Sequence, residues 1–586
     1  MTYGETSAYH GVQWADVFSS MQLFNVGHSL DEYRSPPKKI CIVGAGLAGL
    51  AAAYELGKIN HHVRLFESSD RIGGRVYTHY FTPDSYGELG AMRVPADHQL
   101  TLKYVDEEFK LKRRPFVNRN WEAYLHFGRK TFKWEQWERV LAHLSGRIGV
   151  PLGKEKMPWQ ILEEVAKSAY GPLPAAAQWA MFSSGLEALI DPEMRKLLAE
   201  CESDSLWQYI TAKGRSAEVL ASIRESNEGA IHLTQEEWEV LGRLSLDLPF
   251  ERAAFTQWLI NQLALQNPEK YEIEGGMSKL VEKFAASIEG RDSESIKLRS
   301  PVKEIACIDE NSERFVRVGW QDPSGGSVRY GKFDYVICAA PAPATARIHF
   351  PQMSQKKFEA LTNLTYLPSA KALIHCSRRY WETQDGIFGG VSHTDLGTQQ
   401  SWYPSDNALP DLSRRGGVVE AGFTESGGSD KIGGYWTARH QERSNDPGTF
   451  LAAYMYGPTA QHFASLSEEE RREFVCQNVG QYHAWLLDGN VINEKVVKDF
   501  FAYSWDDHSS PGGGAYAFFS PGEFSRYQKL VEQSIPAQNP RIFFAGEHTA
   551  VAHAWMQAAL QSGVAAARRV AQHAKGFKHA AHESFI

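Results

Sequence analysis

Three glycines, Gly44, Gly46 and Gly49, follow directly on the apolar run 40–43 and precede an alanine-rich run at 50–56. In such a turn the first glycine permits the sharp bend, the second lets the backbone approach a pyrophosphate, and the third lets helix and strand pack closely. The helix start adds free N–H groups and the positive end of its dipole. The spacing therefore predicts a strand, a turn and a helix that bind a dinucleotide.

A carboxylate stands at the end of the next apolar run. Residues 63–66 predict a second strand, and Glu67 follows it, 18 residues after Gly49. At this distance an acid can accept hydrogen bonds from both ribose hydroxyls and disfavours a 2′-phosphate. A glycine turn between two packed elements would explain the three glycines. It would not explain why a strand, the glycines, a helix, a second strand and a terminal acid follow in this order. The motif alone does not separate FAD from NAD.

The composition narrows the class of protein. The chain has 586 residues, 43% of them hydrophobic and 23% charged, which is typical of a soluble globular protein with two to four domains. A formal charge of −8 disfavours nucleic-acid binding. No apolar run reaches the length of a membrane-spanning helix, so a cytoplasmic protein is expected, with secretion of a processed form left open. The six scattered cysteines are expected to be reduced, and no metal ligand set is assigned.

The predicted secondary structure, which must position these groups, differs between segments of the chain. Residues 129–269 have apolar side chains at helical spacing and predict a helical domain. Runs at 296–305, 315–320 and 335–339 predict strands, whereas residues 406–448 lack periodicity and predict a long surface loop. A last strand at 541–547 leads into a turn and a C-terminal helix.

Two further motifs resemble those of the flavin amine oxidase superfamily. The first, Glu67-Ser-Ser-Asp-Arg-Ile-Gly-Gly-Arg75, is similar to its second phosphate loop, in which Gly74 and Arg75 would meet the pyrophosphate. The second, Phe544-Ala-Gly-Glu-His-Thr549, is similar to its C-terminal motif, in which Glu547 would hold the ribityl chain. The resemblance implies FAD. The cofactor-binding residues it implies are Gly44, Gly46, Gly49, Glu67, Gly74, Arg75, Met92, Arg93, Val302, Gly546, Glu547, Trp555 and Met556.

Within this superfamily the chain resembles the L-amino acid oxidases. In Gly87-Glu-Leu-Gly-Ala-Met-Arg-Val-Pro95, the resemblance implies that Arg93 clamps the substrate α-carboxylate, for which a guanidinium fork is suited. It implies that Lys371 holds a water beside flavin N5 and that Tyr454, with Tyr456 as a rival, shares the carboxylate. Trp555 would form an aromatic wall beside the substrate amine. The implied catalytic residues are thus Arg93, Lys371, Tyr454 and Trp555.

Other pocket residues are less specific. Trp505 and residues 514–516 are expected to line the substrate pocket. Some members of the family place a histidine in the helical segment as a base, but His126, His143 and His232 cannot be matched to it. No base is assigned, and desolvation of the amine is expected to promote loss of its proton before hydride transfer.

The fold class expected is α/β: a Rossmann-like FAD domain, an interleaved β-sheet substrate domain and a helical domain. The expected ranges are 37–95, 270–345 and 536–575 for the FAD domain, 1–36, 96–128 and 346–535 for the substrate domain, and 129–269 for the helical domain.

The expected function is oxidation of a free L-amino acid, weakly favouring large or basic side chains, with O2 as acceptor, by a homo-oligomer. Alternatives are an amino-acid 2-monooxygenase, a polyamine or monoamine oxidase, a flavin-bound scaffold without chemistry, and a nicotinamide dehydrogenase.

Overall fold

A computed structural model of the chain describes most of the sequence outside its ends and the segment 145–268. The described residues are 29–144, 205, 208, 238–239, 241–242, 251–255, 257–258, 269–310, 313–322, 326–411, 413–414, 434–506, 512–550 and 552–577. The prediction of a helical domain over 129–269 therefore lies largely outside the described residues, although residues 130–144 form β8, η4 and α4.

The glycine loop belongs to a five-stranded parallel sheet assembled from distant parts of the chain. Its order is β10-β2-β1-β14-β26, with bounds Ile296–Lys297, His62–Phe66, Lys39–Val43, Tyr335–Cys338 and Ile542–Phe544. Apolar side chains fill β1, β14 and β26, as expected for strands covered on both faces. The predicted strands at 40–43 and 63–66 are confirmed, and the Rossmann-like α/β fold with them.

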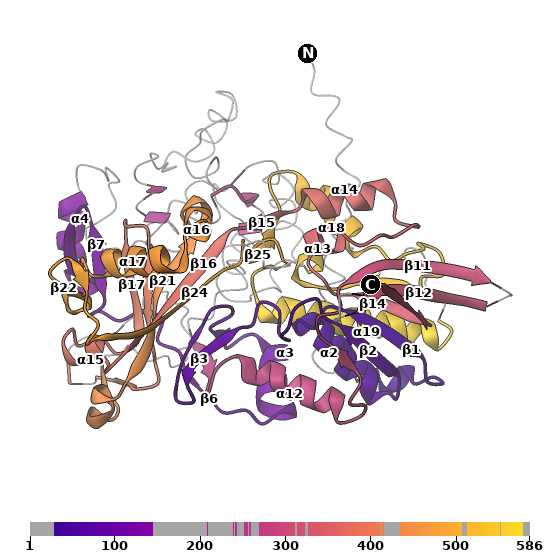
Figure 1. Cartoon of the computed structure of the whole chain (residues 1–586), viewed down its shortest axis with the longest axis horizontal. Helices are drawn as coiled ribbons and strands as arrows, with labels where there is room; N and C mark the ends of the chain where they lie inside the picture. The colour runs from indigo at the N-terminus through magenta and orange to yellow at the C-terminus, as the bar shows by residue number, and fades with distance from the viewer. Residues whose placement is uncertain are drawn as a thin grey trace, which may run out of the picture.

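Three helices pack beside this sheet: α2 (Leu47–Lys58), α12 (Ser278–Glu289) and α19 (Met556–Ala574). Figure 1 shows them together with β1 and β2 in one half of the molecule, away from β16 and β24. Helix α2 begins at Leu47, so it includes and extends the predicted run at 50–56. It crosses α19 closely, because a Cβ atom on Gly563 would lie 2.1 Å from the Ala48 carbonyl oxygen.

The prediction of one strand over 296–305 is wrong. Residues 296–297 form β10 of the parallel sheet, while Val302–Glu310 form β11 of a second sheet with β12 (Glu313–Gln321) and β13 (Val328–Phe333). Between them Arg299 has a φ of 50° and Pro301 has no N–H to donate, so the chain turns instead of extending.

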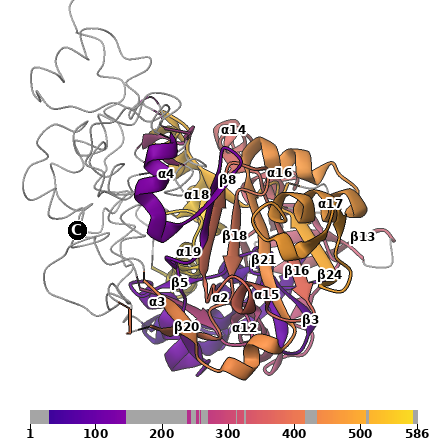
Figure 2. The same cartoon turned by 90° about the vertical axis from the view of Figure 1, so that its left-hand side faces the viewer.

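A seven-stranded sheet forms the other half of the molecule. Its order is β24-β16-β21-β18-β17-β7-β8, with bounds Val497–Ser504, Ser369–Cys376, Gly448–Tyr456, Gln400–Tyr403, Gly390–Thr394, Tyr124–Phe127 and Lys130–Lys133. Helices α16 (Gly457–Ala464) and α17 (Glu468–Val479) lie along it, as Figure 2 shows from the side. In this sheet Lys371 stands directly opposite Tyr454 on one neighbour and Tyr503 on the other. The three side chains therefore share one face.

Further strands and helices complete the described part of the chain. The strands are β3 (Thr78–Thr82), β4 (Ser85–Glu88), β5 (Val94–Pro95), β6 (Arg113–Pro115), β9 (Lys270–Ile273), β15 (Thr365–Leu367), β19 (Ala408–Pro410), β20 (Trp436–Ala438), β22 (Leu487–Asp488), β23 (Val491–Ile492) and β25 (Tyr516–Phe518). The helices are η2 (Leu30–Tyr33), α3 (Gln99–Leu102), η3 (Lys103–Glu108), η4 (Trp134–Gln136), α4 (Trp137–Leu144), α13 (Ala342–Thr345), α14 (Gln355–Asn363), α15 (Tyr380–Thr383), η7 (Gln441–Asn445), η8 (Ala484–Leu486), α18 (Glu523–Glu532) and η9 (Glu547–Thr549).

The prediction of a surface loop over 406–448 is wrong at both ends of that range. The side chain of Asp406 accepts two hydrogen bonds of 2.6 Å from Arg379, and the amide of buried Asn407 donates to Glu382. Strands β19 and β20 pair with each other. Residues 412 and 415–433 lie outside the described part of the chain.

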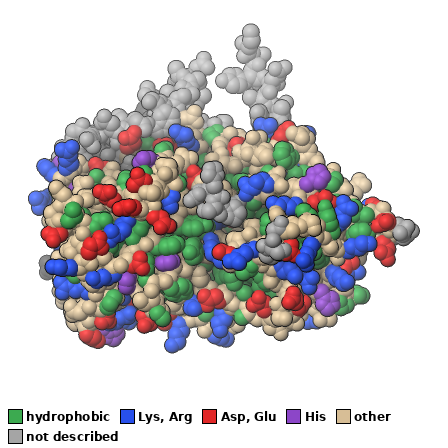
Figure 3. All heavy atoms as spheres, viewed as in Figure 1, with side chains coloured by type: hydrophobic (Ala, Val, Ile, Leu, Met, Phe, Trp, Pro, Cys, Tyr) green, Lys and Arg blue, Asp and Glu red, His purple; other side chains and the backbone are tan. Residues whose placement is uncertain are grey.

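The surface and the thiols agree with the composition. On the face in Figure 3, acidic and basic side chains of the described residues are interspersed. The five described cysteines are free, and Cys41, Cys338, Cys376 and Cys476 are buried. Among the described residues, no helix combines the length and apolar character that crossing a bilayer requires.

Candidate active site

Side chains from both halves of the molecule line one cavity of about 810 Å³. It brings together most of the residues that the sequence singled out. The lining includes Gly44, Gly46, Glu67, Gly74, Arg75, Val302, Lys371, Tyr454, Gly546, Glu547, Trp555 and Met556. Gly49, Met92 and Arg93 are not among the lining residues, and each has a different position, described below.

The glycine turn has the conformation that its sequence predicts. Gly44 has a φ of 100°, which side chains other than hydrogen rarely allow. Gly49 lies behind the loop, where an added Cβ atom would come within 2.0 Å of the Gly44 carbonyl oxygen. Gly46 and Gly74 face each other, and a Cβ atom on Gly74 would lie 3.3 Å from the Gly46 Cα atom. Two facing glycines without side chains thus form a cradle that fits a pyrophosphate.

Glu67 is fixed at the end of β2 by backbone donors. Its Oε2 atom accepts from the Ala45 N–H and its Oε1 atom from the Ser69 N–H, both at 2.9 Å. The carboxylate therefore holds the two phosphate-binding loops together at the edge of the cavity, where a ribose would lie.

Arg75 and Glu547 form an ion pair across 472 residues of sequence. The Arg75 Nη1 atom lies 2.8 Å from Glu547 Oε1, which also accepts from the Ala517 N–H at 2.9 Å. Burial disfavours the ionised carboxylate, but the charge of Arg75, the neighbouring His553 and the hydrogen bonds from Ala517 and Arg75 together outweigh it, so the pKa of Glu547 lies below its ordinary value. Against the same effect of burial, Glu547 raises the pKa of Arg75. Both groups are therefore charged.

Arg93 is partly buried in a different environment. Its guanidinium lies 4.9 Å from the ring centroid of Trp402 and 6.0 Å from that of Phe116, and its Nη1 atom donates to Asn118 Oδ1 at 3.2 Å. No carboxylate of the described residues forms an ion pair with it. Burial lowers its pKa, which the hydroxyls of Tyr454 and Tyr456 only partly offset. The arginine is a cation without a protein counter-ion in the described structure.

Lys371 lines the cavity and is 1% exposed. Its Nζ atom donates to the carbonyl oxygens of Gly90 at 2.7 Å and Glu88 at 3.3 Å, and contacts Met92 Sδ at 3.5 Å. It also lies 4.3 Å from the ring centroid of Tyr454. Burial lowers its pKa to about 7, and burial raises the pKa of Glu88 to about 8. Met92 is thus brought beside Lys371 without reaching the cavity.

An aromatic wall completes the cavity. Trp505, Ala515 and Tyr516 line it as predicted, whereas Gly514 does not, and Trp555 packs edge-on against His98 at 5.0 Å. Sequence reasoning missed Tyr503, which lies two residues before Trp505 on β24. The alternation of side chains along a strand would have placed both on one face.

The histidines considered as bases lie elsewhere. His126 is bound through Nδ1 to Thr131 at 2.9 Å, and the ring of His143 packs 5.6 Å from Phe132. Neither is among the residues that line the cavity. His232 lies outside the described residues. Within the described part of the chain, His, Cys, Asp and Glu side chains also form no group of three that could hold a metal ion.

Comparison with known proteins points in the same direction. Residues 47–571 match the family described as flavin containing amine oxidoreductase. The L-amino-acid oxidases of Notechis scutatus scutatus and Bungarus fasciatus are each 28% identical, over 92% of this chain and 87% of theirs.

Two solved structures share the fold. Cyclohexylamine oxidase from Brevibacterium oxydans IH-35A has a TM-score of 0.60 at 14% identity, over 92% of this chain and 99% of that one. Putrescine oxidase has a TM-score of 0.57 at 16% identity, over 91% and 98%. With the glycine cradle, the paired Arg75 and Glu547 and the family match over residues 47–571, the chain belongs to the flavin-containing amine oxidoreductases and is an FAD-dependent oxidase.

Proposed function

We propose that the protein oxidises free L-amino acids to 2-oxo acids, ammonia and hydrogen peroxide. The observation that carries the proposal is the environment of Arg93, a partly buried guanidinium without an acid partner among the described residues. A charge removed from water is costly unless an opposite charge compensates for it, so this position favours an anionic ligand. A simple amine carries no such anion. The similarity to L-amino-acid oxidases supports the same substrate class.

In this proposal Arg93 and Tyr454 bind the α-carboxylate. The guanidinium interacts electrostatically with the hydroxyls of both Tyr456 and Tyr454, and of these two tyrosines Tyr454 lines the cavity. Trp555 and Tyr516 form the aromatic wall that orients the amine. Enclosure of the amine disfavours its charged form, so that it binds in the neutral state that oxidation requires. FAD, which the glycine cradle, Arg75 and Glu547 would hold, would supply the redox chemistry, namely transfer of a hydride from the α-carbon and of two electrons to O2.

Lys371 acts on this site from the side of the seven-stranded sheet. Its three contacts with the segment 88–92 position Met92 and therefore Arg93. We propose in addition that it holds a water at the cofactor, as in the family that the sequence resembles. At its pKa of about 7 the amine can both donate and accept a hydrogen bond near neutral pH.

The test compares amino acids with the amines that lack their carboxylate. The purified holoenzyme is mixed anaerobically with L-leucine or isoamylamine, and with L-phenylalanine or phenylethylamine, while flavin absorbance is followed. We expect bleaching by the L-amino acids alone, and equal amounts of ammonia and peroxide after O2 is admitted. Release of carbon dioxide with an amide would indicate a monooxygenase instead. Equal bleaching by the amines would contradict the carboxylate clamp.

A further inference from the structure

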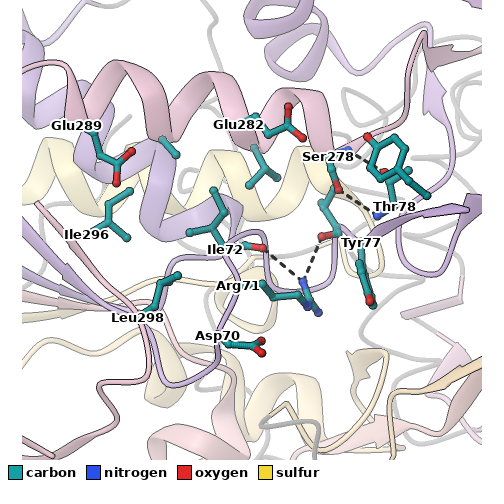
Figure 4. Close-up of a pocket in the computed structure, with 14 residues that line it drawn as sticks. Asp70, Arg71, Ile72, Tyr77, Thr78, Ser278, Glu282, Glu289, Ile296 and Leu298 are labelled. Carbon is teal, nitrogen blue, oxygen red and sulfur yellow. Dashed lines mark hydrogen bonds between the residues drawn. The ribbon is translucent and has the colours of Figure 1, made fainter. Parts of the chain in front are cut away.

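A second pocket lies behind the phosphate-binding loop. It has a volume of about 440 Å³ and lies between the loop at 70–72, strand β3 and helix α12. Figure 4 shows Glu282 and Glu289 on one side of it and Arg71 with Tyr77 on the other. Six of the residues that line it are apolar: Ile72, Val76, Val281, Ala285, Ile296 and Leu298. The pocket is thus lined by both charged and apolar side chains.

Only a thin partition separates this pocket from the cofactor cavity. Asp70, Arg71, Val76 and Tyr77 line both spaces. The guanidinium of Arg71 lies 4.3 Å from the ring centroid of Tyr77 and donates long hydrogen bonds, of 3.4 and 3.5 Å, to the carbonyl oxygens of Ile72 and Val76. No carboxylate of the described residues forms an ion pair with Arg71. One weakly bound side chain therefore forms much of the partition.

The partition faces the part of the cavity that holds Lys371. Tyr77 packs edge-on against Tyr503 at 5.4 Å, and Tyr503 stands directly opposite Lys371 in the sheet. Arg71 lies 5.8 Å from the ring centroid of Trp505, another lining residue. A small molecule that passes Arg71 would therefore arrive on the Lys371 side of the cavity.

We propose that this pocket admits dioxygen to the cofactor cavity, with the stacked pair Arg71 and Tyr77 as its gate. Dioxygen is small, neutral and apolar, so it enters an apolar pocket that a zwitterionic amino acid does not. Side-chain fluctuations of Arg71 and Tyr77 suffice to pass a diatomic molecule. The inference rests on oxygen as the electron acceptor of the enzyme and is independent of which amine is oxidised.

The test reduces the volume of the pocket by substitution and measures only the reoxidation of the reduced flavin by oxygen. Holoenzyme reduced with dithionite, so that no amino acid is needed, is mixed with oxygenated buffer in a stopped-flow instrument. We expect Ala285→Phe to lower the second-order rate constant at least fivefold and Ala285→Leu to lower it less. Ala286→Phe is the matched control, because Ala286 is exposed on the same helix and does not line the pocket. Equal rate constants for wild type and Ala285→Phe would overturn the proposal.

Two further measurements address the route itself. In crystals under xenon pressure, we expect xenon in the pocket of the wild type and its loss in Ala285→Phe, and an empty wild-type pocket would contradict an apolar gas route.

Arg71→Ala should raise the rate constant for the reaction of the reduced enzyme with oxygen, normalised to the amount of bound flavin. An unchanged rate constant would exclude Arg71 as the gate. Failure of every amino acid to bleach the flavin would refute the substrate proposal but leave this experiment intact.

Discussion

Two arginines only 18 residues apart have opposite electrostatic environments. Arg75, in the cofactor half of the cavity, is paired with the carboxylate of Glu547, and its pKa is raised. Arg93, toward the seven-stranded sheet, has aromatic rings and an amide as neighbours, and its pKa is lowered. The charge of Arg75 is compensated by a carboxylate of the protein. The charge of Arg93 has no carboxylate partner among the described residues and is available to an anionic ligand.

Arg75 is therefore expected to stabilise the fold and the cofactor site, and Arg93 to bind the substrate. Breaking an internal buried pair leaves an uncompensated ion, so the fold and the cofactor suffer. Removing a cation that has no partner takes away a desolvation cost, so binding should suffer without loss of stability. Stability and activity measured together on variants of the two sites therefore test the comparison.

The largest effect is expected for Glu547→Ala. It leaves Arg75 without its counter-ion beside the cofactor, and breaking such a pair costs about 3 kcal/mol, which is roughly a 100-fold weaker affinity for FAD. Titration of the apoprotein with FAD, followed by flavin fluorescence, measures the change. Glu532→Ala is the control, because it breaks an ion pair between the more exposed Glu532 and Arg569, neither of which lines the cavity. Equal losses in both variants would show that the first pair has no special role.

Arg93→Met should have the next largest effect. Loss of charged hydrogen bonds to a carboxylate costs about 2–3 kcal/mol, so kcat/KM for L-amino acids should fall roughly 100-fold. FAD content should stay unchanged, and Tm should stay equal or rise. Steady-state kinetics and thermal melting of the same preparation measure kcat/KM and Tm together. A large fall in Tm would place Arg93 among the structural charges instead.

Lys371→Met should change how stability depends on pH. The pKa of Lys371 falls from 10.5 to about 7 on folding, so between these values the unfolded chain binds more protons. Stability of the wild type therefore gains up to ~1 kcal/mol per pH unit as pH rises from 7, a gain that the variant lacks. Tm measured from pH 7 to 9.5 should rise relative to that of the variant. Parallel Tm curves would mean that Lys371 stays protonated on folding.

The smallest effect is expected for Trp402→Leu. The ring of Trp402 contributes about 1 kcal/mol of cation–π interaction to holding Arg93, so KM should rise roughly fivefold with kcat little changed. Initial rates over a range of L-leucine concentrations measure both constants. A fall in kcat at constant KM would indicate that Trp402 acts on the reacting atoms and not through Arg93.

Sequence patterns predicted the cofactor half well because its signals are local. Gly44 and Gly49 each meet a steric demand of the backbone, and a loop with these demands has few other sequences. Gly74 and Arg75 follow within one short motif. The break between β10 and β11 was missed because apolar residues continue across 296–305, although Pro301 within the run argued against a single strand.

Of the residues around the proposed substrate site, only a few could be predicted from the sequence. Lys371 and Tyr454 were proposed from a resemblance, and only the sheet register shows that they stand opposite each other. Trp402 and Asn118 carry no local signal, because their relation to Arg93 exists only after distant strands have packed. The same holds for Arg379 and Asp406, whose ion pair joins a segment that looked like a surface loop.

The parallel sheet has a consequence for synthesis on the ribosome. Its edge strand β26 and the acid Glu547 are translated some 500 residues after the glycine loop, yet Glu547 and the glycine loop line the same cavity. A nascent chain that already carries Gly44 to Gly49 still lacks the partner of Arg75 and one wall of the cofactor site. The complete cofactor site can therefore form only after the last strand has been synthesised.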